Sequence, residues 1–400
     1  MRLRHGVAAA ALLSTFVMNA GGIAAAEPRQ AMPGWAQDGF GPGNGGFNPG
    51  ERWLAGARLG QLAQQWSIPA IGQQVCARQA APVTDGTTIY LPGRESLTAH
   101  DATTGKQIWS YPYSDPMDTR TPLLALHDGT LLVGTSGCQS VSDPNGELLA
   151  LDPATGKPRW TAKTEAPDEV LAADDGVVVV GGADAGWMSS TAFSVATGKQ
   201  VWERERGLAT AGASARGTLL LTEHDTAFRP TGAVAVDIKT GKSLWHTDQP
   251  WSVRAADETG RFFLADDVSG ALLKVNADSG QVVWTKSDLS GPLAVDRDQI
   301  YVVSGTALVS LAADTGTERW RRNNAGADLR PVVAGNVVYT VTSRGRLEAL
   351  NTRNGHQLGF RPHYKPADHP VIDDGRLYLT DGKQLRAYAA PRSSCCTGPR

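Results

Sequence analysis

The chain has little of several features that would assign it to a class at once. Only 4 of its 400 residues are Cys and 5 are Met, and its 38 Lys and Arg nearly balance its 40 Asp and Glu. The net charge of −2 gives no basic field for a nucleic-acid backbone, so we expect no nucleic-acid partner. Past residue 26 there is no apolar run of about 18 residues, so we expect no membrane span in the mature chain. Because 41% of the residues are hydrophobic and 20% are charged, the chain should fold.

The first 26 residues are typical of a secretory signal. Arg2 and Arg4 precede an apolar stretch, Val7 to Met18, and Ala24 to Ala26 supply small side chains before a cleavage point at Glu27. The apolar stretch is short for a membrane span, which favours cleavage over an uncleaved anchor. No Cys lies near the cleavage point, so we expect a secreted, extracytoplasmic protein without a lipid at that end.

An internal repeat dominates the rest of the chain. Each copy has an alternating apolar strand, an Asp-x-x-Thr/Ser-Gly turn and a short strand ending in Trp, as in Leu148 to Trp160 (LLALDPATGKPRW). The copies recur at intervals of about 40 residues, which with four short strands per unit indicates propeller blades. The marker positions are Trp66, Trp109, Trp160, Trp202, Trp245, Trp284 and Trp320, with Gly359 where an eighth Trp is expected.

Each element of the repeat has a physical role. The Asp can accept hydrogen bonds from amides of the tight turn, and the Gly adopts a positive φ that a residue with a Cβ resists. We expect the Trp to lie flat between neighbouring blades. There it would bury about 200 Å² of surface, which stabilises the fold by several kcal/mol.

Two incomplete segments complement each other. QLAQQWSI (Gln61 to Ile68) has only the last strand of a unit, whereas the final unit ends at KQLRAYAAP (Lys383 to Pro391) without a Trp strand. The sequence therefore predicts an all-β, eight-bladed β-propeller of four-stranded antiparallel blades, in which N- and C-terminal strands share the closing blade. The predicted divisions are a cleaved signal (1–26), a Gly/Pro-rich lead-in (27–58), the propeller (59–391) and a C-terminal tail with a Cys pair (392–400).

The repeat resembles the PQQ-like, or quinoprotein-type, β-propeller family, whose blades carry A-x-D-x-x-T-G-x-x-x-W. The similar stretches include Ala99 to Trp109, Ala150 to Trp160 and Ala235 to Trp245. The lead-in, Pro33 to Trp66, is also similar to the opening of secreted members. That family includes pyrroloquinoline-quinone dehydrogenases and non-catalytic members of the BamB type, so the signature indicates the fold and says little of chemistry.

For the enzymes of the family, the resemblance implies a quinone stacked over a Trp, a Ca²⁺ held by Glu, Asn and Asp, an Asp base, an Arg beside the quinone and often an adjacent Cys pair. Cys395 and Cys396 are adjacent but lie in the tail rather than in an early blade, and the short repeat intervals leave little room to enclose a cofactor. We therefore expect no cofactor and a secreted, non-catalytic scaffold that binds a ligand or a protein. The alternative is a PQQ- and Ca²⁺-dependent alcohol or sugar dehydrogenase, and a further alternative is another type of enzyme that uses the central funnel.

Residues just before the first strand of each blade should form a ring around the axis. In chain order they are Gln79, Arg120, Glu169, Thr210, Arg254, Ser290, Arg330 and His369. Three arginines, a carboxylate and an imidazole suit an anionic or sugar-like ligand held by forked hydrogen bonds, and a water-filled polar channel is the alternative. Asp168 projects away from its neighbour Glu169, and we expect this pair in an exposed turn.

The remaining residue types predict no metal site. The histidines lack ligand spacing, and His363 and His369, which flank Asp368, are expected in an exposed loop. In an exported protein, four cysteines favour disulfides. Cys76 would pair with Cys395 or Cys396 and Cys138 with the other, or Cys76 would pair with Cys138 beside an adjacent tail pair. We favour the tail pairing because it would reinforce ring closure. We expect a monomer whose partner is a protein, a cell-envelope component or a small molecule.

Overall fold

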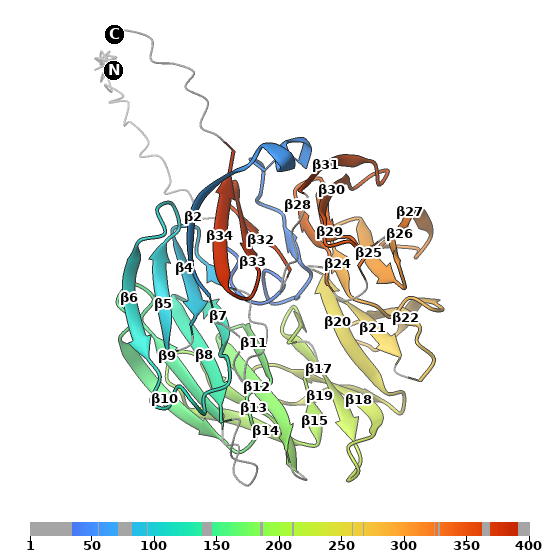
Figure 1. Cartoon of the computed structure of the whole chain (residues 1–400). Helices are drawn as coiled ribbons and strands as arrows, with labels where there is room; N and C mark the ends of the chain where they lie inside the picture. The colour runs from blue at the N-terminus through green and yellow to red at the C-terminus, as the bar shows by residue number, and fades with distance from the viewer. Residues whose placement is uncertain are drawn as a thin grey trace, which may run out of the picture. The chain divides into compact units, whose positions relative to one another are not determined.

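Eight β-sheets follow one another along the chain and stand around a common axis (Figure 1). They confirm the predicted eight-bladed, all-β propeller. The computed structural model describes residues 34–54, 56–70, 82–93, 95–137, 146–184, 187–209, 212–257, 259–266, 268–323, 325–326, 329–361 and 369–390. Within these ranges the one helical element is the 3₁₀ helix η1 (Gly56–Gln61), and no helix has the length and hydropathy to cross a membrane.

Seven blades are formed from consecutive stretches of chain, each strand antiparallel to the next. The strands of the first four blades, from the axis outward, are β3 (Val83–Thr84), β4 (Thr88–Pro92), β5 (Ser96–Asp101) and β6 (Gln107–Pro112); β7 (Leu123–His127), β8 (Thr130–Ser136), β9 (Gly146–Leu151) and β10 (Pro158–Thr164); β11 (Val170–Asp174), β12 (Val177–Asp184), β13 (Trp187–Ser194) and β14 (Gln200–Glu205); and β16 (Ser214–Ala215), β17 (Thr218–His224), β18 (Pro230–Asp237) and β19 (Ser243–Thr247), with β15 (Gly207–Leu208) also paired to β17.

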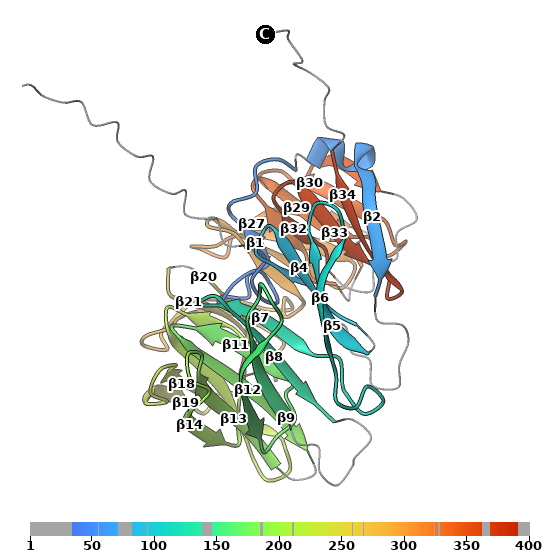
Figure 2. The same ribbon diagram turned by 90° about the vertical axis from the view of Figure 1, so that its left-hand side faces the viewer.

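The other four blades complete the ring. Their strands are β20 (Trp251–Asp257), β21 (Arg261–Asp266), β22 (Leu272–Asn276) and β23 (Val282–Lys286); β24 (Leu293–Val295), β25 (Gln299–Ser304), β26 (Ala307–Ala312) and β27 (Glu318–Asn323); β28 (Val332–Ala334), β29 (Val337–Val341), β30 (Leu347–Asn351) and β31 (Gln357–Arg361), with β1 (Phe47–Asn48) parallel to β28; and β32 (Val371–Asp373), β33 (Arg376–Thr380), β34 (Gln384–Ala389) and β2 (Ala63–Pro69). The last blade joins N- and C-terminal strands, as predicted (Figure 2).

The hydrophobic core lies between the blades rather than within any one of them. Successive residues of a strand point to opposite faces, so a blade that is packed on both sides needs apolar residues at consecutive positions. In β12, Val178, Val179 and Val180 are all buried. Val179 packs with the following blade, whereas Val178 and Val180 pack with the preceding one. This arrangement explains why the inner strands read as continuous apolar runs.

Tryptophan side chains join the outer parts of neighbouring blades. Trp160 Nε1 donates a hydrogen bond of 2.9 Å to Val195 O, in the turn of the next blade. The glycine of that turn lies against the ring, because a Cβ on Gly198 would come 2.6 Å from Trp160 Cδ2. The same indole-to-carbonyl bond links Trp66 to Ala102, Trp109 to Pro153, Trp202 to Ile238, Trp245 to Ala277, Trp284 to Ala313 and Trp320 to Thr352.

The closing blade lacks this turn, because its strands β34 and β2 come from different parts of the chain. η1 directly precedes β2, which is the place of the turn in the other blades, and it packs against β31. Leu59 of η1 is buried, and Arg361 of β31 donates a hydrogen bond of 3.1 Å to Leu62 O. With η1 in place of a turn, no indole is needed on β31, which accounts for Gly359 at that position of the repeat.

Replacing Gly156 by Ala should destabilise the propeller more than replacing Gly129 by Ala. Both glycines have a positive φ, +69° and +65°, so each alanine carries a backbone cost of about 1–2 kcal/mol. A Cβ on Gly156 would also lie 2.6 Å from Trp109 Cε3, whereas at Gly129 nothing described lies within 4 Å. We expect G156A to cost about 1–3 kcal/mol more than G129A in thermal unfolding followed by circular dichroism. Equal losses would show that the indole contact contributes little to stability.

Candidate functional site

Residues 34–48, which we call the central loop, run around the axis of the ring (Figure 1, blue). The loop hydrogen-bonds to the inner strand of every blade in chain order. The amides of Thr84, Leu126, Ser214, Ala256, Val295 and Val333 donate to the carbonyls of Trp35, Ala36, Pro42, Gly43, Gly45 and Gly46 over 2.6–2.9 Å. In the other two blades Gln37 exchanges two bonds with the Ala173 backbone, and Asn48 Nδ2 donates to Ile372 O. Because the inner strand is an edge with amides of its own to satisfy, these bonds complete its pairing.

Close approach to the inner strands explains why the loop is rich in glycine. A Cβ on Gly43 would lie 2.5 Å from Ala256 O, and one on Gly39, at φ +68°, would lie 2.3 Å from Arg330 Nη1. The stretch around Gly43 therefore serves as a backbone contact surface. Its glycines were conspicuous in the sequence, but the groups that require them belong to distant blades.

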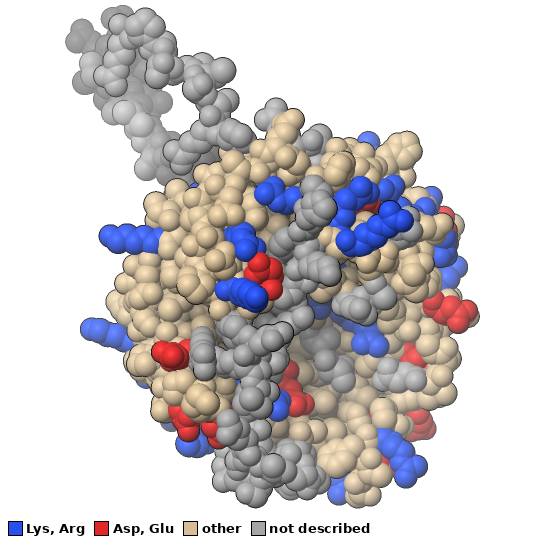
Figure 3. All heavy atoms as spheres, viewed as in Figure 1, with Lys and Arg blue, Asp and Glu red and all other residues tan. Residues whose placement is uncertain are grey.

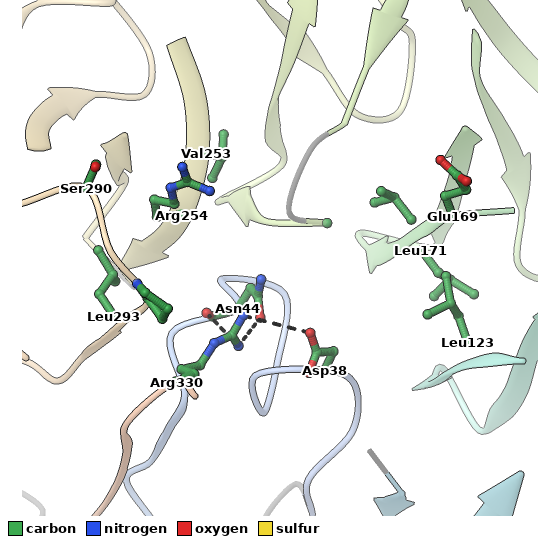
Figure 4. Close-up of a pocket in the computed structure, with 13 residues that line it drawn as sticks. Asp38, Asn44, Leu123, Glu169, Leu171, Val253, Arg254, Ser290, Leu293 and Arg330 are labelled. Atoms are coloured by element: carbon green, nitrogen blue, oxygen red, sulfur yellow. Dashed lines mark hydrogen bonds and ion pairs between the residues drawn. The ribbon is translucent and has the colours of Figure 1, made fainter. Parts of the chain in front are cut away.

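A cavity of about 480 Å³ lies where the chain enters the inner strands (Figure 4). Apolar side chains such as Leu171 and Leu293 form part of its wall. The polar part of the lining comes from the central loop (Asp38 and Asn44), from residues just before inner strands (Glu169, Ser290 and Arg330) and from Arg254, which lies within β20. A second cavity of about 540 Å³, at the other ends of the inner strands, is lined by the opposite part of the central loop, including Phe40 and Phe47. The central loop thus borders both cavities.

Arg330 is held by the central loop. Its guanidinium donates a short hydrogen bond to the Asn44 side-chain oxygen and lies 3.8 Å from Asp38 Oδ2. His369 Nε2 lies 3.2 Å from the other Asp38 oxygen. The Asp38 side chain is 58% exposed. Desolvation by the protein around it works to raise its pKa, but the charges of Arg330 and His369 and hydrogen bonds from His369 and the Gly39 amide hold that pKa below its ordinary range.

The opposite wall carries a second ion pair. Arg120 Nη1 lies 2.9 Å from Glu169 Oε1, and Figure 4 shows Glu169 and Arg254 on opposite sides of the cavity. The described groups around the cavity are thus three guanidiniums, of Arg120, Arg254 and Arg330, and two carboxylates, of Asp38 and Glu169. This excess of positive charge favours an anionic group.

The structure brings together most of the residues that the sequence placed at the funnel. Glu169, Arg254, Ser290 and Arg330 line one cavity, Arg120 reaches it through Glu169, and His369 contacts Asp38. The predictions that lie outside the described residues are the signal and its cleavage point, Gln79, Thr210, His363 with Asp368, and the cysteines Cys76, Cys138, Cys395 and Cys396.

Three features of this site differ from the expectations. His369 was expected in an exposed loop, and this was wrong: its side chain is only 9% exposed and contacts Asp38. Asp38 and Asn44 were missed, because nothing in their local sequence shows that the lead-in returns to the axis. Asp168 was expected in an exposed turn, and this was wrong: it is fully buried and accepts a hydrogen bond of 3.0 Å from the Thr164 hydroxyl. Glycine makes the room for it, because a Cβ on Gly146 would lie 2.6 Å from Asp168 Oδ1.

The cavity does not fit a quinone with Ca²⁺. Ca²⁺ takes about six to eight oxygen ligands, but Asp38 and Glu169 each face an arginine. No aromatic ring on which a planar quinone would stack is among the described lining residues. The described part of the chain also holds no group of three His, Cys, Asp or Glu side chains arranged for a metal. The residues present therefore suit a polar organic ligand better than this cofactor.

Comparisons with known sequences find outer membrane assembly factors and a quinoprotein dehydrogenase. A family model described as "Outer membrane protein assembly factor BamB" matches residues 93–271 and 268–358. The outer membrane protein assembly factor BamB of Bordetella pertussis is 26% identical over 302 residues, 70% of this chain and 74% of that protein. The Yersinia pestis protein of the same name is 25% identical over 308 residues, 75% of this chain and 60% of that protein. Quinoprotein alcohol dehydrogenase PedH of Pseudomonas putida is 28% identical over 148 residues, 37% of this chain and 24% of that protein.

Solved structures match the fold more widely. Quinohemoprotein alcohol dehydrogenase from Comamonas testosteroni superposes with a TM-score of 0.68 at 15% identity, covering 90% of this chain and 81% of that chain. BamB from Moraxella catarrhalis gives a TM-score of 0.58 at 19% identity, covering 82% of this chain and 97% of that chain. Because both an enzyme and an assembly factor match at such low identity, these structures show the fold alone.

Replacing Asp373, where the central loop meets the closing blade, should change how stability depends on pH. Its side chain is buried 3.5 Å from Asn48 Nδ2, and burial, with the charges of Asp374 and Glu51, raises its pKa to about 7. In the unfolded chain the group would ionise near pH 4, so its folded form binds the extra proton between about pH 4 and 7 and stability falls as pH rises through that window. Asp373→Asn, which stays neutral, should raise stability by about 2–4 kcal/mol at pH 8 and have little effect at pH 4.

Thermal unfolding of wild type and D373N from pH 4 to pH 8 measures this difference. Asp248→Asn is the matched control, because that side chain is 94% exposed. A difference between D373N and wild type that is constant across the range would contradict the raised pKa.

Proposed function

The chain belongs to the PQQ-like β-propeller family. Because proteins with this fold have unrelated activities, we propose a function for this chain on the basis of the residues that line its cavity. The protein is a secreted, non-catalytic binding scaffold, and the cavity beside the central loop holds a small ligand with a carboxylate on a sugar-like body. The observation that carries this proposal is the set of polar groups around one cavity: Arg254 and Ser290 on one side, Glu169 on the other, and the clamped Arg330 between them (Figure 4).

The lining provides the contacts that such a ligand needs. Guanidinium groups bind carboxylates through paired, charge-assisted hydrogen bonds, and Asp38 and Asn44 hold Arg330 in a fixed orientation for this. Ser290 and the Glu169 carboxylate supply a hydroxyl and an acceptor for ligand hydroxyls. Leu171, Val253 and Leu293 provide apolar surface for a ring face. A preformed cavity with a few converging polar groups is the usual form of a small-molecule site.

The extracytoplasmic location rests on the signal-like residues 1–26 and on relatives named outer membrane protein assembly factors. The same relatives favour a second candidate function, the binding of a protein partner. The exposed apolar residues Ile108, Val201, Leu244 and Val283, each beside a blade Trp on an outermost strand, offer surface for such a partner. This role would use the rim of the ring and leave the cavity available.

The cavity proposal is tested by titrating the purified protein with D-glucuronate in a calorimeter. Wild type should bind it, and Arg254→Ala should weaken binding by about tenfold or more, as expected for loss of a charge-assisted hydrogen bond. D-glucose, which lacks the carboxylate, should bind weakly or not at all. The thermal stability of R254A should stay close to that of wild type.

Arg229→Ala is the matched control, because this arginine is 78% exposed and away from the cavity. Its affinity for glucuronate should equal that of wild type. Absence of glucuronate binding, or equal affinity in R254A and wild type, would refute the cavity proposal.

A further inference from the structure

A second cluster of arginines lies at the outer part of two neighbouring blades. It is separate from the 480 Å³ cavity beside the central loop, which we call the central cavity. The cluster surrounds a small cavity of about 210 Å³, and we call it the arginine pocket. Its lining residues are Arg322, Asn323, Thr342, Arg344, Arg346 and Glu348, none of which lines the central cavity. In Figure 3, basic side chains gather over the part of the ring where Figure 1 places β27 to β31.

Glu348 is the buried carboxylate that holds two arginines of the pocket in place. It lies on β30, its side chain is only 3% exposed, and its two oxygens are taken by two different arginines. Arg322 donates to one oxygen through Nε and Nη2, at 3.1 and 3.0 Å. Arg346 donates a short hydrogen bond to the other. One buried carboxylate therefore fixes two guanidiniums side by side.

Further contacts hold these two arginines in place. Arg322 also donates to Gln357 Oε1 at 3.0 Å. The Arg346 guanidinium lies over the Phe360 ring, 4.6 Å from its centroid, which is a cation–π contact. Both side chains remain about one-third exposed, so part of each guanidinium faces the pocket. The arginines are thus pre-oriented and still accessible.

The charges in the pocket do not balance. Three guanidiniums and one carboxylate leave a net charge of +2 (3 − 1) among the lining residues. One arginine is enough to neutralise the charge of Glu348, so the second arginine bound to it leaves an unbalanced positive charge. Arg344, at the tip of the hairpin between β29 and β30, makes no hydrogen bond or ion pair with any described residue. Holding three cations together is unfavourable unless an anion joins them.

We propose that the arginine pocket binds the phosphate group of an anionic ligand, with Arg344 completing a site that Arg322 and Arg346 preform. A phosphate has several acceptor oxygens and one to two negative charges, so it can accept from all three guanidiniums, and arginine forks match its geometry. The side chains of Asn323 and Thr342 add polar groups at the edge. Such a phosphate belongs either to a soluble phosphate ester or to a phospholipid headgroup.

The position of the pocket separates it from the function proposed for the cavity. The hairpin that carries Arg344 lies at the same end of its blade as Arg330, so both sites open toward one face of the propeller. They share no residue, and either one can be present without the other. Variants of Arg254 should therefore leave phosphate binding unchanged.

Two arms test the proposal and identify the source of the phosphate. In one, glycerol 1-phosphate is titrated into the protein at low salt by calorimetry. In the other, the protein is sedimented with vesicles of phosphatidylglycerol in phosphatidylcholine. We expect binding in at least one arm, weakened about tenfold by Arg344→Gln and weakened in the same direction by Arg322→Lys, which keeps the charge beside Glu348 but loses the fork.

Arg353→Gln is the matched control. Arg353 is exposed in the outer turn of the same blade as Arg344, and its replacement by Gln removes the same charge. Its binding should equal that of wild type. Binding to the soluble ester assigns the site to soluble phosphates, and binding to vesicles alone assigns it to lipid headgroups. Absence of binding in both arms, or equal loss in R344Q and R353Q, would overturn the proposal.

Discussion

The contact between each indole and the turn of the next blade is the interaction on which the rest of the structure depends. It has two parts, which the Trp202 contact illustrates. Trp202 Nε1 donates a hydrogen bond to Ile238 O, and Gly241, which has no side chain, lets the indole ring lie flat against the turn. Neither blade can keep this contact without the other. The blades therefore stabilise one another in pairs, and the apolar clusters between them follow the same pairing. Every feature at the axis is placed by this arrangement.

Much of the fold could be predicted, because the repeat is local and each of its residues acts within a few positions of itself or on the next copy. Trp66 and the segment Lys383 to Pro391, which no Trp strand follows in the sequence, were enough to predict the shared blade. The central loop could not be predicted, because it bonds to backbone groups of strands from Thr84 to Ile372, and backbone groups leave no mark on the sequence. Glu169, Arg254 and Arg330 followed from topology, whereas Asp38 and Asn44 depend on where the loop returns. Asp168 was misplaced because its room is made by glycines of neighbouring strands.

The two candidate sites use arginine in different ways. At the axis, the central loop supplies both the acid and the amide that orient Arg330, so the geometry of the candidate cavity depends on this loop. At the arginine pocket, the buried Glu348 orients guanidiniums from its own blade and from the neighbouring one, and the central loop takes no part in these contacts. The residues that repeat in each blade thus stabilise the fold, whereas the candidate binding residues lie at positions that differ from blade to blade.

The central loop also imposes an order of events on folding. Residues 34–48 and β2 emerge first during synthesis, yet their partners extend to β34, so they find their final places only after nearly the whole chain is available. Contacts between such distant segments slow folding and prolong the life of intermediates with open sheet edges. A chain crossing a membrane in an extended state would reach its native form only after the last blade had arrived. Any nascent form shortened at its C-terminal end would thus leave β2 and Asn48 without their partners in the closing blade, and its open sheet edges would be targets for chaperones or proteases.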